Sequence, residues 1–528
     1  MSNELNYLLS RAVKGLMSRR EFVGRAGALG VMATTANALL ATAARAEGPK
    51  KGGHAALGLA GGESSNTLDP ALTLSQAPYS VMAHIGEPLL RVNPDNTLDL
   101  RVAEEISSTP DAKIWKFKIR QGVKFHDGST LTADDVLKTM QRHSDEKATS
   151  GALGIMKGIA SMKADGDMFE ITLTDANADL PYLMADRHLL IQPGGGMENP
   201  ASGIMSGPYK IVVNEPGVRH TFERFADYWD DGVGHFDTTE ILIINDVTAR
   251  TAALQSGKVQ FANLIDPKIA DLLGKAPGVV LERTQGRGQN VFVMHCDTAP
   301  FDNKDLRLAL KYAIDRQEMV DKILRGYGTV GNDIPINAAY PLFDETIPQR
   351  PFDLAKAAEH YKASGHDGSP IVLEVSDVAF PGAIDAAQLF QQSAQKAGIP
   401  LEVKRDPADG YWNDVWNKVP FCASYWGGRP VQDQMYATAY LSTADWNDTK
   451  FKNEKFDALL MSARAELDQD KRKVMYREMA DILMEEGGLI LPMFNDFLDA
   501  RSDTIAGWVS NPNGDMMNDQ AGIKCWLA

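Results

Sequence analysis

Residues 120–136 read RQGVKFHDGSTLTADDV, a stretch in which tight turns separate two regular elements. Gly122 and Gly128 suit such turns, because glycine accepts backbone angles that are strained for other residues. An Asp-Gly pair is also a common turn dipeptide. His126 lies between the two glycines, and we interpret it as structural rather than as a metal ligand because its neighbours are turn residues. The stretch therefore predicts a compact turn that joins a strand to a helix.

A strand pattern and a helix pattern flank this turn. The segment IWKFKIR (114–120) alternates apolar and polar residues, as a half-buried strand does. Thr132 can cap a helix that begins at Ala133, and Asp134 and Asp135 would lie in the positive first turn of that helix. Strand and helix patterns continue to alternate along the rest of the chain, which predicts an α/β protein.

The size and charge of the chain limit the possible classes of protein. A chain of 528 residues is longer than one hydrophobic core usually serves, so two or more lobes are expected. The 54 basic and 70 acidic residues give a formal net charge of −16. A strongly acidic protein repels nucleic acids and anionic membrane surfaces, and we expect neither as a partner. Cys296, Cys422 and Cys525 lack metal-ligand spacing, which favours a role as buried small hydrophobic side chains.

The first 46 residues have the features of an export signal. Arg19 and Arg20 are adjacent, a weakly apolar stretch rich in Ala, Gly and Thr follows, and an A-x-A cleavage pattern ends at Ala46. This arrangement resembles a twin-arginine (Tat) signal peptide. A basic amphipathic helix or a membrane anchor is the alternative, but small residues make a poor membrane span. We expect cleavage after Ala46, no lipid anchor, and a mature periplasmic protein.

No motif of a familiar catalytic site occurs in the sequence. Residues 326–331 (GYGTVG) match the dinucleotide-binding pattern G-x-G-x-x-G, but they follow a helix pattern and run into IPI instead of joining a strand to a helix. P-loop, H-E-x-x-H and G-x-S-x-G motifs are missing, and the ten histidines show no metal-ligand spacing. We therefore expect no catalytic residues, no metal site and no cofactor. A binding protein is favoured over the alternative of an exported hydrolase.

Several blocks of sequence together resemble one family, the periplasmic solute-binding proteins (family 5) of peptide, opine and nickel ABC importers. The resemblance covers essentially all of the chain after the signal, and the blocks occur in the order typical of the family. They are LDPA (68–71), the segment 85–141 that begins IGEPLLRVN and contains the opening stretch, SGPYKI (206–211), FADYWDDG (225–232), and the segment 301–336 that begins FDNKDLRLAL.

The resemblance implies two hinged α/β lobes with a ligand cleft between them and an extra domain inserted in the first lobe. The lobes would close over a peptide or peptide-like solute and deliver it to permease subunits that work with separate ATP-binding subunits. We expect a monomer when the protein is free. Carried onto this chain, the parts are the signal peptide 1–46, lobe one 47–83, 215–295 and 495–528, the inserted domain 84–214, and lobe two 296–494.

The resemblance places the loop SYWGGRPVQDQMY (424–436) at the cleft. Peptide binders of the family hold the ligand's ammonium group with an aspartate three residues after a tryptophan, but here Trp426 is followed at that spacing by Arg429. The region that would supply an arginine for a peptide carboxylate, residues 374–385, contains no arginine. A plain dipeptide is therefore disfavoured as the ligand. An opine-like anionic conjugate, nickel or haem are the alternatives to a peptide-like solute.

Two interpretations of Arg429 remain open. It could pair with Asp433, four residues on, at the surface of a solvated turn, where such a pair contributes little. It could instead point into the cleft and bind a carboxylate or phosphate as a two-pronged donor, with Tyr425, Trp426 and Tyr436 lining the pocket. We favour the second interpretation because the resemblance puts this loop at the cleft.

Overall fold

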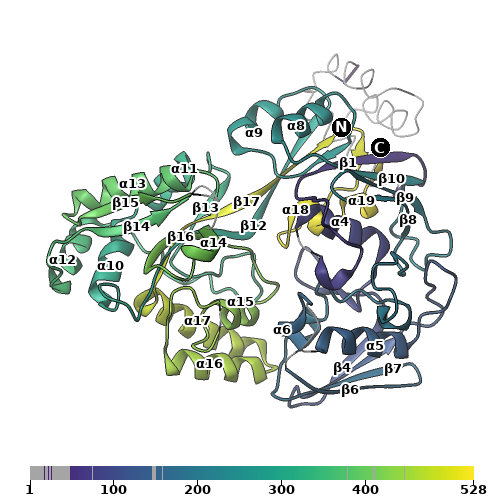
Figure 1. Ribbon diagram of the computed structural model, residues 1–528, viewed down its shortest axis with the longest axis horizontal. Helices are drawn as coiled ribbons and strands as arrows, with labels where there is room; N and C mark the ends of the chain where they lie inside the picture. Colours follow the sequence, from purple (N-terminus) through teal and green to yellow (C-terminus); the bar gives the residue numbers. More distant parts are fainter. Residues whose placement is uncertain are drawn as a thin grey trace.

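The computed structural model describes residues 48–528 except 74, 146–149, 157, 377–378, 408–410 and 445, together with Met17, Phe22, Arg25 and Ala26. The predicted signal residues Arg19, Arg20 and Ala46 lie outside these residues. Two bodies of mixed α/β structure lie side by side, and long strands run from one to the other (Figure 1). We use the names lobe one, lobe two and inserted domain for the residue ranges predicted above.

One mixed sheet of eleven strands extends through both lobes. Its strands follow the order β15-β14-β16-β12-β17-β11-β1-β10-β9-β8, and β13 also pairs with β17. The strands are β1 (His54–Leu59), β8 (Tyr209–Glu215), β9 (Arg219–Arg224), β10 (Thr238–Ile243), β11 (Phe261–Ala262), β12 (Val279–Met294), β13 (Gly328–Val330), β14 (Ile371–Val375), β15 (Leu401–Arg405), β16 (Phe421–Trp426) and β17 (Leu489–Ser502).

Strands β12 and β17 connect the lobes. They pair antiparallel over almost their whole length, from Val279 opposite Ser502 to Val293 opposite Leu489. The register is irregular between Gln285 and Gln289, and the intervening residues read Gly-Arg-Gly. A Cβ atom on Gly286 would lie 2.6 Å from the ring of Phe497 on β17, so glycine permits the close approach of the two strands. The irregular register lies within β12 at residues 285–289, and the lobe boundaries themselves stay a prediction.

Lobe one carries short helices against its half of the sheet. Its core joins strands β1, β9 and β10 to the helix α4 and to the C-terminal segment. The elements are η1 (Pro70–Leu72), α4 (Gln76–Ile85), α8 (Val247–Gln255), α9 (Pro267–Leu273), β18 (Ile505–Ala506), α18 (Asp515–Asn518), α19 (Ala521–Lys524) and β19 (Trp526–Leu527).

The inserted domain has its own antiparallel sheet, β4-β5-β7-β6, and a separate hydrophobic core. Helix α5 lies against this sheet (Figure 1). The elements are β2 (Leu90–Val92), β3 (Leu98–Leu100), β4 (Ala103–Ser108), β5 (Ile114–Ile119), α5 (Ala133–Ser144), α6 (Leu153–Met156), β6 (Ile159–Asp165), β7 (Met168–Leu173), α7 (Leu180–Leu183) and η2 (Pro193–Gly196).

The opening stretch of the sequence forms the predicted turn and helix start in this domain. The hydroxyl of Thr132 accepts a hydrogen bond from the backbone N–H of Asp135, whose carboxylate accepts from the backbone N–H of Thr132 at 2.8 Å. This reciprocal pair is a capping box, and it satisfies two N–H groups that a helix start would otherwise leave unpaired. His126 contacts the carbonyl oxygen of Gly207 through its ring at 3.0 Å, which confirms a structural position.

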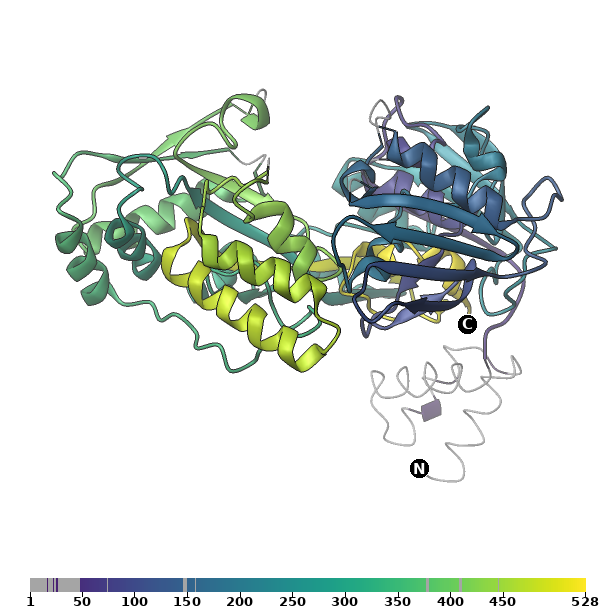
Figure 2. The same ribbon diagram turned by 90° about the horizontal axis from the view of Figure 1, so that it is seen from below.

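Lobe two is built on β14, β15 and β16 with helices around them, and it contains the largest core. Figure 2, seen from below, shows α16 and α17 on the side of this lobe that faces the inserted domain. The helices are α10 (Lys304–Ala313), α11 (Arg316–Lys322), α12 (Leu354–Ser364), α13 (Ala383–Lys396), α14 (Tyr411–Asp414), α15 (Gln432–Ala439), α16 (Glu454–Ala465) and α17 (Gln469–Glu486). All three cysteines are free, and Cys422 and Cys525 are buried as predicted.

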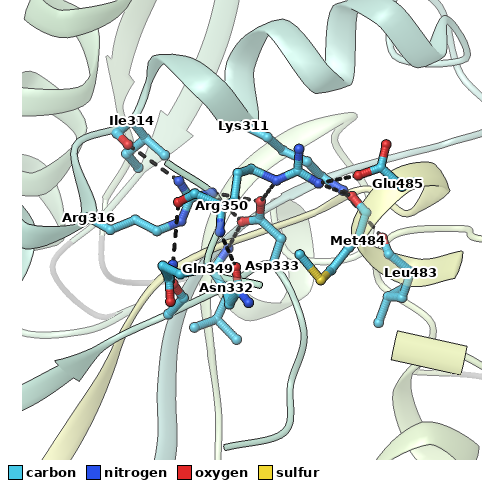
Figure 3. A network of polar contacts seen from close by, with 12 residues as sticks. Lys311, Ile314, Arg316, Asn332, Asp333, Gln349, Arg350, Leu483, Met484 and Glu485 are labelled. Carbon is cyan, nitrogen blue, oxygen red and sulfur yellow. Dashed lines mark hydrogen bonds and ion pairs between the residues drawn. The ribbon is translucent and has the colours of Figure 1, made fainter. Parts of the chain in front are cut away.

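A buried polar cluster fixes the joint between α17 and the connecting strand β17 (Figure 3). Lys311 and Arg350 each donate a hydrogen bond to the carbonyl oxygen of Met484, in the last turn of α17, at 2.8 Å. Cations at this end oppose the negative end of the helix dipole and satisfy carbonyls that have no partner within the helix. Burial lowers the pKa of Lys311 to about 7, although the charge of Asp333 partly offsets this effect.

Asp333 is the carboxylate at the centre of this cluster (Figure 3). It is fully buried and accepts hydrogen bonds from Arg316 at 2.6 and 2.7 Å, and Arg350 forms an ion pair with it at 2.9 Å. Its carboxylate also accepts from the backbone N–H of Leu491 in β17 at 3.0 Å. The carboxylate of Asp333 therefore links strand β17, which connects the lobes, to the core of lobe two.

Candidate functional site

The loop that follows β16 lies where the two lobes meet. Arg429 in this loop is half-buried, and its Nη1 donates to the carbonyl oxygens of Gly427 and Gly428 at 3.2 and 3.3 Å. Its backbone N–H donates to the hydroxyl oxygen of Tyr340 at 3.1 Å. Among the described residues, no carboxylate forms an ion pair with the guanidinium of Arg429. That side chain therefore keeps donors that an anionic ligand could use.

Asp433 does not form the pair with Arg429 that one interpretation predicts. Its carboxylate is buried and accepts hydrogen bonds from Nε of Arg464, at the end of α16, at 3.0 and 3.2 Å. Burial raises the pKa of Asp433, and the charge of Arg464 opposes the shift. The surface ion pair is therefore wrong for this structure, because Asp433 already has a cation on its own side of the loop.

The predicted aromatic residues lie in different surroundings. Tyr436 is fully buried in the core of lobe two, against the rings of Phe456 and Tyr476, so the structure does not bring it to the surface of the loop. Tyr425 is 54% exposed. Trp426 is buried, donates from its indole nitrogen to Asp448 at 3.0 Å, and has the guanidinium carbon of Arg429 6.0 Å from its ring centroid. Trp426 therefore lies beside Arg429, whereas Tyr436 lies in the core of lobe two.

Arg287, a residue that the sequence analysis did not single out, supports the same loop from β12. Its Nη1 donates to the carbonyl oxygen of Arg429 at 3.1 Å. The loop approaches so closely that a Cβ atom on Gly428 would lie 2.1 Å from the Cβ atom of Arg287. This contact explains the second glycine of the Trp-Gly-Gly-Arg sequence, because any side chain there would collide with Arg287. The sequence offers one sign that Arg287 lies in a closely packed place, because it stands between two glycines, Gly286 and Gly288.

The opposite side of the seam carries a second half-buried arginine, Arg187 of the inserted domain. The guanidinium carbon of Arg187 lies 4.3 Å from the ring centroid of Tyr79. Arg187 pairs with Asp519 at 2.9 Å and donates to the side chain of Asn518 at 3.0 Å. Burial lowers the pKa of Arg429, and the positive charge of Arg187 lowers it further, whereas Tyr340 and Asp186 act in the opposite direction. The charges that act on Arg429 thus come from both sides of the seam.

The segment 516–519, which supplies the partners of Arg187, has an unusual backbone. Met516, Met517, Asn518 and Asp519 all have positive φ, between 52° and 67°. A left-handed turn of this kind costs roughly 1–2 kcal/mol for each residue that is not glycine. Such strain persists where the surrounding contacts determine the conformation, and it is frequent at ligand sites. The strained turn therefore marks this part of lobe one as a candidate wall of the ligand site.

The lobes also touch at the outer rim of the seam. The backbone N–H of Ala178 in the inserted domain donates to the carbonyl oxygen of Arg464 at 2.7 Å. Next to this contact, Arg472 at the start of α17 forms a buried ion pair with Asp179. The structure thus holds the two lobes in contact across the predicted cleft.

The fold and this seam define a two-lobed solute-binding protein. Residues 97–448 match the family described as bacterial extracellular solute-binding proteins, family 5 middle, and the chain belongs to this family. It is a solute-binding protein of the kind used by ABC importers. The predicted family, fold and transport class are confirmed by these matches.

Similar proteins support this assignment. The glutathione-binding protein GsiB of Salmonella typhi is 27% identical over 482 residues, which cover 88% of this chain and 93% of that protein. Among solved structures, AgaA from A. tumefacien R10 in complex with agropinic acid has a TM-score of 0.76 at 23% identity and covers 90% of this chain and 99% of that one. HbpA2 from Haemophilus parasuis has a TM-score of 0.80 at 20% identity, with 90% and 100% covered.

The family's proteins are periplasmic. Within the part of the chain that the structure describes, no helix is both long enough and apolar enough to cross a membrane. The same residues contain no group of three or more His, Cys, Asp or Glu side chains that could hold a metal ion.

Proposed function

We propose that this protein captures an anionic, peptide-like solute between its lobes, that Arg429 anchors the anionic group, and that the closed protein delivers the solute to inner-membrane permease subunits. The observation that carries the proposal is a half-buried guanidinium at the interlobe seam with no carboxylate partner among the described residues. A buried charge without a counter-charge is costly, and a ligand carboxylate or phosphate would supply the missing partner. Binding would involve no chemical change of the solute.

The names of similar proteins favour the same class of ligand. One relative is named for glutathione, a peptide-like compound with two carboxyl groups, and one similar structure holds agropinic acid. Both compounds carry carboxylates, which an arginine binds through two parallel hydrogen bonds. A positively charged Arg429 would repel the free ammonium group of a plain peptide. The solute we expect is therefore an acidic or modified peptide or an opine-like conjugate.

Native mass spectrometry of the protein purified from the periplasm tests the ligand class. We expect an intact, anionic solute to co-purify, and the separated solute to reduce the radius of gyration measured by small-angle X-ray scattering when it is added back. Closure of hinged lobes around a ligand is the physical reason for the smaller radius. A neutral or cationic solute would contradict the proposed ligand class. Release of a chemically altered product would contradict binding without catalysis.

We further propose that the protein reaches the periplasm by the twin-arginine route and is cleaved after Ala46. The adjacent Arg19 and Arg20 and the A-x-A pattern support this route. Replacing both Arg19 and Arg20 with lysine keeps the charge and should abolish periplasmic accumulation, measured by fractionation and immunoblotting. Replacing Arg11 and Arg25 with lysine is the matched control. Equal export of both variants, or a mature N-terminus other than Glu47, would contradict this part of the proposal.

A further inference from the structure

Arg287 occupies the crossing point between the lobes. It lies in β12 between Gly286 and Gly288, where the register with β17 is irregular. A Cβ atom on Gly288 would lie 2.8 Å from the side chain of Asn495 on β17, so this part of the crossing is packed without space for larger residues. The side chain of Arg287 is only 2% exposed. A large charged side chain is therefore enclosed at the place about which the lobes would rotate.

The guanidinium of Arg287 contacts lobe two, lobe one and the inserted domain at once. Within lobe two, it donates to the carbonyl oxygen of Ala339 at 2.7 and 3.1 Å and to that of Arg429 at 3.1 Å. It also donates to the side-chain oxygens of Asn513 in lobe one and of Asn96 in the inserted domain. These five bonds use all five N–H groups of the side chain. No donor remains for a ligand, so Arg287 acts on the site through the protein.

All the acceptors of Arg287 are neutral. Among the described residues no carboxylate pairs with it, and burial lowers its pKa to about 10. Its guanidinium carbon lies 4.8 Å from the ring centroid of Tyr340, the residue whose hydroxyl holds the backbone N–H of Arg429. Arg287 and Tyr340 therefore fix the carbonyl and the N–H of Arg429 from the same side. Opening of the seam would detach Asn96 and Asn513, whereas the bonds within lobe two could remain.

We propose that Arg287 is a positioning residue that holds the Arg429 loop in its binding conformation and fastens that loop to lobe one and the inserted domain when the lobes are closed. The proposal deepens the proposed function, because it takes the Arg429 loop as the ligand anchor. Its physical basis is that a buried guanidinium with five bonds to neutral acceptors is stable only while those acceptors surround it. Closure of the lobes brings all of these acceptors around the guanidinium of Arg287, and opening of the lobes exposes its charge to water.

In the ligand-free protein, we expect open and closed forms to interconvert and Arg287 to favour the closed form, which a bound solute favours further. Two variants separate the two parts of this proposal in that ligand-free protein. Arg287→Met removes all five bonds and should both loosen the loop and enlarge the radius of gyration. The double substitution of Asn96 and Asn513 by alanine removes the two acceptors of Arg287 outside lobe two, together with the hydrogen bond that Asn96 Nδ2 donates to the carbonyl oxygen of Ala339. It should therefore enlarge the radius but leave the loop ordered. Arg219→Met, on strand β9 between β8 and β10, changes the net charge equally and should change neither property.

The measurements are small-angle X-ray scattering and amide hydrogen exchange of residues 424–432, with melting temperature as a check of folding. We expect exchange in this segment to rise at least tenfold in Arg287→Met and to stay within twofold of wild type in the double variant. Wild-type exchange in Arg287→Met would overturn the positioning role. A wild-type radius in the double variant would overturn the fastening role, and this variant decides that point if Arg287→Met does not fold.

These measurements need no ligand, so they stand apart from the test of the proposed function. If the co-purified solute proves neutral while both variants behave as expected, the ligand class fails and the role of Arg287 holds. If the solute is anionic and neither variant differs from wild type, the proposed function holds and the role of Arg287 fails.

Discussion

Replacing Asp333 with asparagine is expected to lower the free energy of unfolding by about 3–5 kcal/mol, as removal of one partner from a buried ion pair commonly does. Asp333 is the carboxylate that Arg316 and Arg350 share in the core of lobe two, and both cations are buried. Asparagine has nearly the same shape but no charge. The two guanidiniums would then lie in the core without a counter-charge, and β17 would lose a charged acceptor at Leu491.

Chemical denaturation followed by circular dichroism measures this loss. Asp481→Asn is the matched control, because Asp481 pairs with Arg477 on the surface of α17 and half of its side chain is exposed. An exposed pair of this kind contributes less than about 1 kcal/mol. Similar stabilities for the two variants would show that the cluster around Asp333 does not hold lobe two together.

The same carboxylate gives stability a defined pH dependence. Burial alone would raise the pKa of Asp333, but the charges of Arg316, Lys311 and Arg350 outweigh burial and hold the pKa below its usual range. The unfolded chain then binds a proton more readily than the folded protein as pH falls below about 4. The contribution of Asp333 is complete above that pH and is lost as pH falls through the folded-state pKa. Asp333→Asn should lack this part of the acid loss of stability.

Replacing Arg429 with alanine is expected to weaken binding of the co-purified solute by about 2–4 kcal/mol, the range seen when one partner of a buried, hydrogen-bonded charge pair is removed. In a closed seam fewer water molecules compete with the ion pair, so the attraction exceeds that of a surface pair. Folding stability should change little, since Arg429 makes no ion pair within the described part of the protein. Isothermal titration calorimetry on wild type and variant measures the difference.

Two further variants sharpen the interpretation of that experiment. Arg429→Lys keeps the charge but loses the two-pronged donor, so an intermediate loss is expected for a carboxylate or phosphate ligand. Arg219→Ala removes a distant surface charge and should leave affinity unchanged. Equal affinities for wild type and Arg429→Ala would remove Arg429 from the site. Tight binding of neutral dipeptides through their free ammonium group would equally contradict an anionic ligand.

Local sequence patterns predicted the features that depend on neighbouring residues. The helix start at Ala133 follows from Thr132 and Asp135, which are three residues apart and form their capping box without help from the rest of the chain. The two-lobed fold followed from the family resemblance over the whole chain. Both kinds of inference succeed because the information lies in short segments or in their order.

Distant contacts explain what the sequence could not predict. Asp433 was expected near Arg429, four residues away, but its partner is Arg464, 31 residues along the chain. Arg287 meets Arg429 across 142 residues and Asn513 across 226, so the local Gly-Arg-Gly pattern does not reveal its partners. Aromatic side chains such as that of Tyr436 are typical of a pocket wall. Tyr436 lies on helix α15, however, with its side chain buried in the core of lobe two. These positions depend on how separate elements pack, which spacing along the chain does not determine.

The shared sheet has a consequence for the synthesis of this protein. Strand β17 pairs with β11 in lobe one and with β13 in lobe two, and it begins at Leu489 of a 528-residue chain. Neither lobe can complete its sheet until this late strand has left the ribosome. Pairing between such distant segments is slow, and unpaired strand edges promote aggregation. The sheets of both lobes can therefore be completed only once β17 has been made, and the strand edges that pair with it stay exposed until then.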